Sequence, residues 1–212
     1  MKLIGLLLLA AAAGSSQPVL VGAKVGGSTG LVGNGAASDG FTTSSAAPTC
    51  YAAGGSVEAR LPRNFGIEFD VVYRHFAYQG GESSPFGSES ESVTGGALEF
   101  PVLVKRRFPG NAANLYVIAG PALETLIGLR NSWVSTLAGG YSVWNTQTNT
   151  GTDSSPATLQ HRMATGFSGG GGLEFRAGPV HISPEIRYTY WAAPNFSNSH
   201  HNQVEILLGV SL

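Results

Sequence analysis

Eight segments of this sequence alternate apolar and polar residues with a period of two, and this pattern limits the possible fold more than any other feature. They span residues 19–26, 51–61, 65–76, 95–108, 115–127, 165–176, 180–191 and 203–212. A period of two is typical of a β-strand whose two faces meet different surroundings. Each segment is about as long as the ~9–11 residues that a tilted strand needs to cross a bilayer. The pattern predicts an all-β fold of eight antiparallel strands.

The connections between these segments alternate between short and long. Short turns are expected around residues 62–64, 109–111 and 177–179, and long loops over residues 27–50, 79–94, 128–164 and 192–202. The long connections are rich in Gly, Ser, Thr and Asn, which favour loops. Bacterial transmembrane barrels have short periplasmic turns, long extracellular loops and an even number of strands. We therefore expect an up-and-down transmembrane barrel with this asymmetry.

The first residues are typical of an export signal. Lys2 precedes an apolar run from Leu3 to Ala13, and small residues follow it. This arrangement predicts a signal peptide over residues 1–16 that is cleaved after about Ala13, and a barrel domain over residues 17–212. The run is too short for a membrane-spanning helix, which needs ~20 residues.

Composition excludes several classes of protein. Charged residues make up 12% of the chain, about half the usual share, so an ordinary soluble helical protein is not expected. The 12 Lys and Arg against 13 Asp and Glu give no electrostatic reason to bind nucleic acid. The Gly169–Gly172 run lacks the features of a phosphate-binding loop, and His200-His201 has no further ligand nearby. We expect no cofactor and no metal site.

Alternation alone does not say which face lies inside the barrel. A soluble eight-stranded barrel of the lipocalin kind turns its apolar face inward. Here the polar face carries many small residues, such as Ala52, Gly54 and Ser56. A water-facing surface has no steric need for small residues, whereas the interior of an eight-stranded barrel is only wide enough for side chains to fill it. We therefore expect the polar face to line a narrow lumen.

The same polar face concentrates the charges of the chain. Buried charges must be paired and hydrogen-bonded, so eight acids and seven bases of nearly balanced sign predict a salt-bridged network that closes the lumen. Its expected members are Lys24, Glu58, Arg60, Glu68, Asp70, Arg74, Glu99, Lys105, Arg107, Glu124, Glu174, Arg176, Glu185, Arg187 and Glu205.

Aromatic residues and prolines give two further expectations. Two aromatic girdles are expected at the membrane interfaces. Their members would be Phe65, Phe108, Tyr116 and Phe175 near the short turns and Tyr73, Tyr188, Tyr190 and Trp191 near the long loops. Three prolines fall within strands, where each removes a hydrogen bond from a ladder, so bulges are expected at Pro101, Pro121 and Pro184.

Together these features resemble the small outer-membrane barrels of the OmpA, OmpX and opacity-protein type. Residues 65–74 (FGIEFDVVYR) and 182–188 (ISPEIRY) also resemble an outer-membrane β-barrel domain found in exported proteins of Gram-negative bacteria. The resemblance implies a place in the bacterial outer membrane and a structural, adhesive or surface-interaction role without a free pore. It also implies contact with outer-membrane lipid, lipopolysaccharide and the barrel-assembly machinery, and an extracellular ligand held by the loops.

Two other functions remain open at the level of sequence. One is a secreted lipocalin-like barrel that binds an apolar ligand. The other is a lipid A-modifying hydrolase, because His181, Ser183 and Glu185 share one strand face. The residues around this trio do not match those of the lipid A deacylases, which are eight-stranded outer-membrane barrels with a His-x-Ser pair. We therefore expect no enzyme. The third long loop holds three aromatics suited to binding, Trp133, Tyr141 and Trp144.

Overall fold

The computed structural model describes residues 19–29, 42–45, 49–84, 87–138, 146–153, 159–193, 195 and 201–212. Their strands are β1 (Val19–Thr29), β2 (Thr42–Ser45), β3 (Thr49–Leu61), β4 (Phe65–Ser84), β5 (Gly87–Phe108), β6 (Asn114–Ala138), β7 (Thr146–Asp153), β8 (Met163–Ala177), β9 (Val180–Trp191) and β10 (Asn202–Ser211). A short 3-10 turn, η1 (Pro62–Asn64), joins β3 to β4. The expected signal peptide lies outside the described residues. Within the described part of the chain, no helix is long and apolar enough to cross a membrane.

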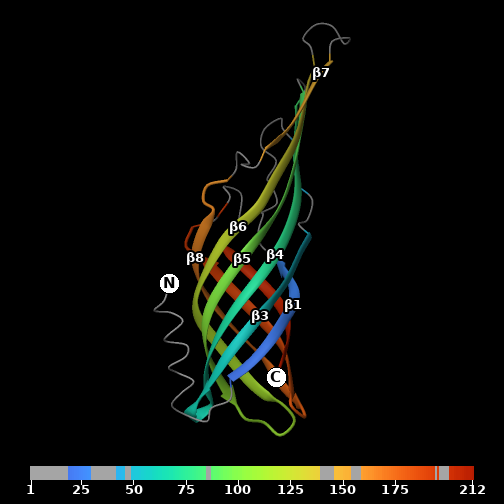
Figure 1. The fold of residues 1–212 in the computed structure, drawn as a ribbon. Coiled ribbons are helices and arrows are strands. Elements are labelled where there is room, and N and C mark those ends of the chain that lie inside the picture. Colours follow the sequence, from blue (N-terminus) through green and yellow to red (C-terminus); the bar gives the residue numbers. More distant parts are fainter. Residues whose placement is uncertain are drawn as a thin grey trace.

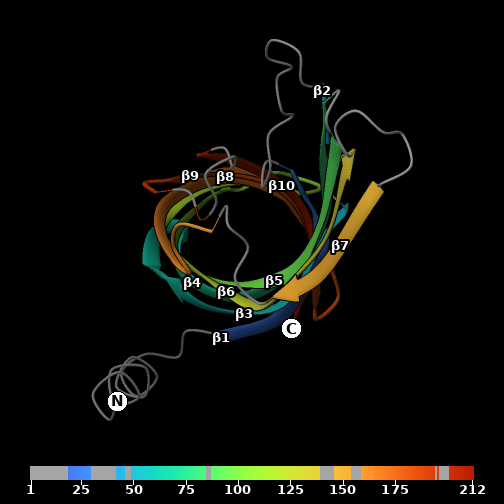
Figure 2. The same ribbon diagram turned by 90° about the horizontal axis from the view of Figure 1, so that it is seen from above.

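Eight of these strands form a closed antiparallel barrel. Hydrogen-bonded neighbours follow the order β1, β3, β4, β5, β6, β8, β9 and β10, and β10 pairs with β1 to complete the ring. Figure 2 shows this ring from above. The first and last described strands meet at this seam, where Gly22 pairs with Ser211. The prediction of an eight-stranded up-and-down barrel is confirmed.

Three strands continue far beyond the ring and form a second structure. β4, β5 and β6 are 20, 22 and 25 residues long, and β2 and β7 pair with the ends of β4 and β6. We call residues 42–45, 79–84, 87–92, 131–138 and 146–153 the projecting sheet; it rises at the long-loop end in Figure 1. The expected loop over residues 79–94 is wrong, because Gln79–Ser84 pairs with Gly87–Ser92 as a hairpin.

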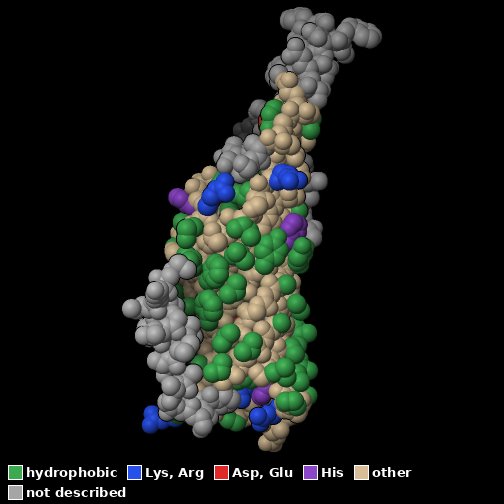
Figure 3. Space-filling view, viewed as in Figure 1, with side chains coloured by type: hydrophobic (Ala, Val, Ile, Leu, Met, Phe, Trp, Pro, Cys, Tyr) green, Lys and Arg blue, Asp and Glu red, His purple; other side chains and the backbone are tan. Residues whose placement is uncertain are grey.

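The outer wall of the barrel is apolar. Ile186, Phe167 and Ile206 are among its most exposed residues, at 59%, 59% and 66%. Figure 3 shows apolar side chains over the visible barrel wall, with Lys and Arg above and below this band. A surface of this kind suits lipid, not water. The lipocalin-like alternative is therefore wrong, because it requires the apolar face inside.

A single residue, Gly128, shifts the alternation of β6. The register between β5 and β6 changes between Thr94 and Gly96. Gly128 adopts φ +60, a left-handed conformation that glycine reaches without a steric penalty and that is typical of one class of β-bulge. Before the bulge even-numbered residues such as Leu126 point inward, and after it Leu129 and Asn131 do. The sequence pattern ended this strand at Ile127 because the alternation breaks there.

The bulges expected at the three prolines are absent from the described strands. At Pro101, Pro121 and Pro184 the pairing on both sides keeps one register. Each proline instead coincides with a short gap in one ladder, for example between Phe69↔Val102 and Val72↔Glu99. A proline lacks only its own N–H donor, so the neighbouring strand loses a bond without gaining a residue.

Candidate functional site

Ten of the predicted lumen residues form one network in the half of the barrel nearest the short turns. We call it the basal network: Lys24, Glu58, Arg60, Glu68, Asp70, Lys105, Arg107, Glu174, Glu185 and Arg187. All are buried except the half-buried Arg60. Each of these side chains points into the lumen, and the residues before and after it in its strand face outward. The set holds five bases and five acids, so its formal charges balance.

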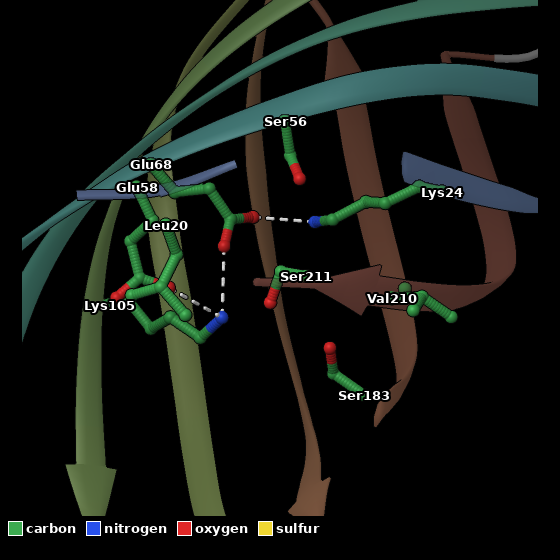
Figure 4. A pocket seen from close by; sticks show the side chains of 10 residues that line it. Leu20, Lys24, Ser56, Glu58, Glu68, Lys105, Ser183, Val210 and Ser211 are labelled. Carbon is green, nitrogen blue, oxygen red and sulfur yellow. Dashed lines mark hydrogen bonds and ion pairs between the residues drawn. The ribbon is translucent and has the colours of Figure 1, made fainter. Parts of the chain in front are cut away.

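Lys24 of β1 binds three carboxylates from other strands. Its Nζ lies 2.5 Å from Glu68, 3.1 Å from Asp70 and 3.3 Å from Glu185. Figure 4 shows Lys24 and Lys105 approaching Glu68 from two sides. One ammonium group thereby holds strands β1, β4 and β9 together across the lumen.

A second chain of contacts runs toward the short turns. Lys105 Nζ donates to Glu58 at 3.2 Å and to Glu68 at 2.9 Å. Arg107 reaches Glu58 at 2.5 Å and Glu174 at 3.0 Å. Glu58 and Glu68 stand directly opposite each other on β3 and β4, so the lysine between them relieves a like-charge pair.

Arg187 and Tyr116 complete the basal network on its other side. The Arg187 guanidinium lies 2.6 Å from Asp70 and 2.7 Å from Glu185. The Tyr116 hydroxyl donates to Glu185 at 3.0 Å, and its ring lies under Lys105, 4.1 Å from Nζ. Tyr116 is 0% exposed, so its expected place in the outer girdle is wrong. It points inward because Leu115 and Val117, its neighbours along β6, face lipid.

The upper half of the lumen holds a different set, the upper cluster of Arg74, Glu99, Glu124 and Glu205. Arg74 Nε lies 3.4 Å from Glu99 and 3.8 Å from Glu205, and its terminal nitrogen pairs with Glu124. Gln203 donates to Glu99 at 3.3 Å. Three acids share one guanidinium here, and among the described residues neither oxygen of Glu205 accepts a hydrogen bond.

Apolar side chains occupy the lumen above the upper cluster. Phe76, Val93, Ala97, Leu126 and Leu129 pack together there and are 0–6% exposed. Trp191 is also inward, 5% exposed and bonded through its ring nitrogen to Gln203, so its expected place in the outer girdle is wrong too. Sequence reasoning missed this layer. For Leu129 the available signal is Gly128, since a glycine at the point where alternation changes phase marks a bulge. The other four residues already follow the inward phase of their strands.

Arg176 lies outside the lumen network, and the trio of His181, Ser183 and Glu185 does not form a catalytic arrangement. Arg176 is exposed at the end of β8, where the strand leaves the wall for the β8–β9 turn. His181 faces Glu174 at 3.4 Å, whereas Glu185 binds Lys24, Arg187 and Tyr116. A base oriented by Glu185 beside Ser183 is therefore not assembled, and the geometry gives no support to the hydrolase alternative.

The expected binding aromatics and the paired histidines are only partly described. Trp133 lies on β6 within the projecting sheet, half-buried and directly opposite Gly151 of β7, where a side chain on Gly151 would collide with its ring. Tyr141 and Trp144 lie outside the described residues, as does His200. His201 contacts the carbonyl oxygen of Trp191 at 2.7 Å through Nδ1.

The sequence matches a family model described as outer membrane protein beta-barrel domain over residues 14–193. The chain belongs to this family of outer-membrane β-barrels. The match and the apolar wall together place the protein in the outer membrane of a Gram-negative bacterium, with the short turns on the periplasmic side. No curated protein sequence matches the chain.

Several solved structures have a similar fold. Neisserial surface protein A is 15% identical, with a TM-score of 0.44 over 93% of this chain and 99% of the other. Ail, the attachment invasion locus protein of Yersinia pestis, is 13% identical, with a TM-score of 0.41 over 92% of this chain and 95% of the other. The translocator domain of the autotransporter NalP from Neisseria meningitidis is 12% identical, with a TM-score of 0.37 over 99% and 94%.

Proposed function

We propose that this protein is a non-catalytic anchor that presents the projecting sheet as a binding surface outside the cell. The length of β4, β5 and β6 carries the proposal. Their 20, 22 and 25 residues are about twice the ~9–11 that a barrel strand needs to cross the membrane. A chain that only had to anchor itself would not need the additional pairing of β2 and β7.

The edge of the projecting sheet favours a partner that adds a strand. Within the described residues, β7 pairs with β6 alone, so its other edge carries unpaired backbone groups. Its sequence, TQTNTGTD, has no proline or lysine, two residues that often protect sheet edges. Such an edge can take up an extended peptide through main-chain hydrogen bonds.

In this proposal the filled lumen is closed and gives the projecting sheet a rigid support. Ion pairs cross the basal network from several strands, and the apolar layer around Phe76 lies above them. Opening a path would separate buried charges from their partners, which is strongly unfavourable. We infer that solutes do not pass freely.

Lipid and assembly partners complete the proposal. Tyr188 and Tyr190 are 45% and 50% exposed on the upper part of β9, as expected for anchors at the outer leaflet with its lipopolysaccharide. The closed ring also has to be completed during insertion, which gives the barrel-assembly machinery its role as a transient partner.

An attachment assay tests the binding surface. The full chain is expressed in a laboratory strain without other adhesins, and cell–cell settling and attachment to an immobilised extracellular-matrix mixture are measured. A variant with Thr150→Lys and Thr152→Lys, two exposed positions of β7, places charges beside the open edge and should remove the attachment. Ser88→Lys, at an exposed position of β5 that β6 separates from β7, is the matched control. Equal attachment by both variants would contradict a role for the β7 edge.

Planar-bilayer recording tests the closed lumen. The purified barrel should insert without a large steady conductance. A stable nanosiemens channel in the unaltered protein would contradict the closed lumen and leave the binding surface unaffected.

A further inference from the structure

One arginine of β5 faces away from the lumen, on the lipid side of the barrel. Leu98, Phe100, Val102, Val104, Arg106 and Phe108 form the outward row of this strand, and Arg106 is its only charged member. Val104 and Phe108, on either side of Arg106, are 53% and 43% exposed. A charged side chain on this face is costly at the bilayer centre and tolerated near the interface. Arg106 therefore lies at the depth of the periplasmic headgroups.

Two aromatic rings fix the position of this guanidinium. Arg106 Cζ lies 5.1 Å from the centre of the Phe65 ring and 5.5 Å from that of Phe108. Phe65 stands directly opposite Arg106 on β4. Contacts of this kind leave the planar N–H groups free to form hydrogen bonds to an anion at the edge of the guanidinium.

The exposed charged residues described at this end of the barrel, Arg63, Arg106 and Arg176, are all positive. Among the described residues, no carboxylate forms an ion pair with Arg106. Two acids at this end, Glu58 and Glu174, are buried in the lumen and bound to Arg107. A second exposed cation, Arg63, lies in η1, which leads directly into Phe65 and lies beside the end of β5.

The chemistry of the surroundings selects the ligand. The periplasmic leaflet of the outer membrane offers glycerophospholipids, whose phosphate accepts paired hydrogen bonds from a guanidinium. Phe65 and Phe108 provide apolar surface for the glycerol and upper acyl chain. We propose that Arg106, with Phe65, Phe108 and Arg63, forms a binding site for the headgroup of an anionic glycerophospholipid in the periplasmic leaflet.

Native mass spectrometry of the detergent-solubilised barrel tests this site. Phosphatidylglycerol and phosphatidylcholine of the same acyl chains are added in turn, and the affinity of the first bound lipid is measured. A basic residue near an anionic headgroup favours binding about fivefold, so the unaltered barrel should prefer phosphatidylglycerol by that factor. Arg106→Gln should abolish the preference. Arg176→Gln, an exposed arginine at the same end on β8, should retain it.

Each result decides for or against the site. Equal affinities in the unaltered barrel, or an equal loss in the Arg176→Gln control, would overturn the proposal. Added lipid A separates the two sources of phosphate: if Arg106→Gln weakens lipid A binding and not phosphatidylglycerol binding, the glycerophospholipid is the wrong ligand. Arg106→Lys keeps the charge and should retain part of the preference; a complete loss would overturn the proposal. Heat-dependent electrophoretic mobility verifies that each variant is folded.

Discussion

The lower and upper parts of β4, β5 and β6 differ in composition although one hydrogen-bonded ladder runs through both. Inside the barrel these strands carry apolar residues outward and charges inward. In the projecting sheet they read GGESS, GSESES and NSWVSTLA at residues 80–84, 87–92 and 131–138, with polar residues on both faces. The backbone pairs in the same way in both parts. The solvent on each side of the sheet, not the ladder, therefore determines which side chains are acceptable.

Two pairs of opposed glutamates make the difference concrete. Glu58 and Glu68 face each other across β3 and β4 in the lumen, and Lys105 binds both. Glu82 and Glu89 stand opposite each other in the projecting sheet, where Glu89 is exposed. Water screens the exposed carboxylate of Glu89, whereas the buried pair requires a cation. Substitutions in the two parts should consequently differ in cost.

The largest effect is expected from removing a base of the basal network. Arg187→Met leaves Asp70 and Glu185 with Lys24 as their shared cation, and should lower the free energy of unfolding by about 3–5 kcal/mol. Urea unfolding of the barrel in lipid vesicles measures this change. Glu89→Gln in the projecting sheet is the control and should change it by less than about 0.5 kcal/mol. Similar costs at both positions would show that the lumen is hydrated.

A charge on the lipid-facing wall should have the next largest effect. Ile186→Arg, on the outward face of β9, is expected to cost about 2–4 kcal/mol because the guanidinium has to enter the hydrocarbon region. The same urea titration applies. Thr150→Arg, at an exposed position of β7, should leave the transition unchanged. If Ile186→Arg is tolerated equally well, the wall does not face lipid at that height.

The bulge between the two parts can be tested through its glycine. Gly128→Ala places a side chain on a residue with φ +60 and should cost about 1–2 kcal/mol. Gly169→Ala is a suitable control, because a methyl group there would meet its nearest neighbour at an ordinary 3.8 Å. Unfolding transitions that shift equally for both variants would argue against a strained bulge at Gly128.

The smallest effect is expected within the projecting sheet. Trp133→Ala removes a ring that covers Gly151 and should weaken the β6–β7 pairing by about 0.5–1 kcal/mol. The same loss of free energy should make amide hydrogen exchange of residues 146–153 about two- to fivefold faster. Exchange in β9 should not change. A loss of protection throughout the barrel would instead show that both parts unfold together.

Much of the barrel could be predicted from the sequence because lipid on one side and a filled lumen on the other impose a strict period of two. Val19, Phe65 and Val180 are the first residues of both the expected and the observed strands. Most residues of the lumen network could be found in the same way. Their pairing could not, because which carboxylate meets Lys24 depends on the register between strands that are distant in sequence.

The parts that could not be predicted lack that constraint. The extension of β5 exposes three successive residues, 88–90, and so lacks the period of two. Ser90, like Gly81 and Ser132, looks like a loop residue although it is paired. Residue type alone favours a girdle position for Tyr116, whereas its place between Leu115 and Val117 predicts an inward side chain. The prolines did not produce bulges because an extra residue, not a missing N–H, is what shifts a register.

The seam between β1 and β10 has a kinetic consequence. It joins residues near the two ends of the chain, such as Lys24 with Gly209, so the ring closes only when the final strand is in place. Contacts between such distant residues have a large loop-closure cost and form slowly. Until then the sheet has two open edges, which favour aggregation. Lys24 also lacks its ion pair with Glu185 until β9 is in place. The last step of assembly therefore completes the ring and finishes the neutralisation of its interior at nearly the same moment.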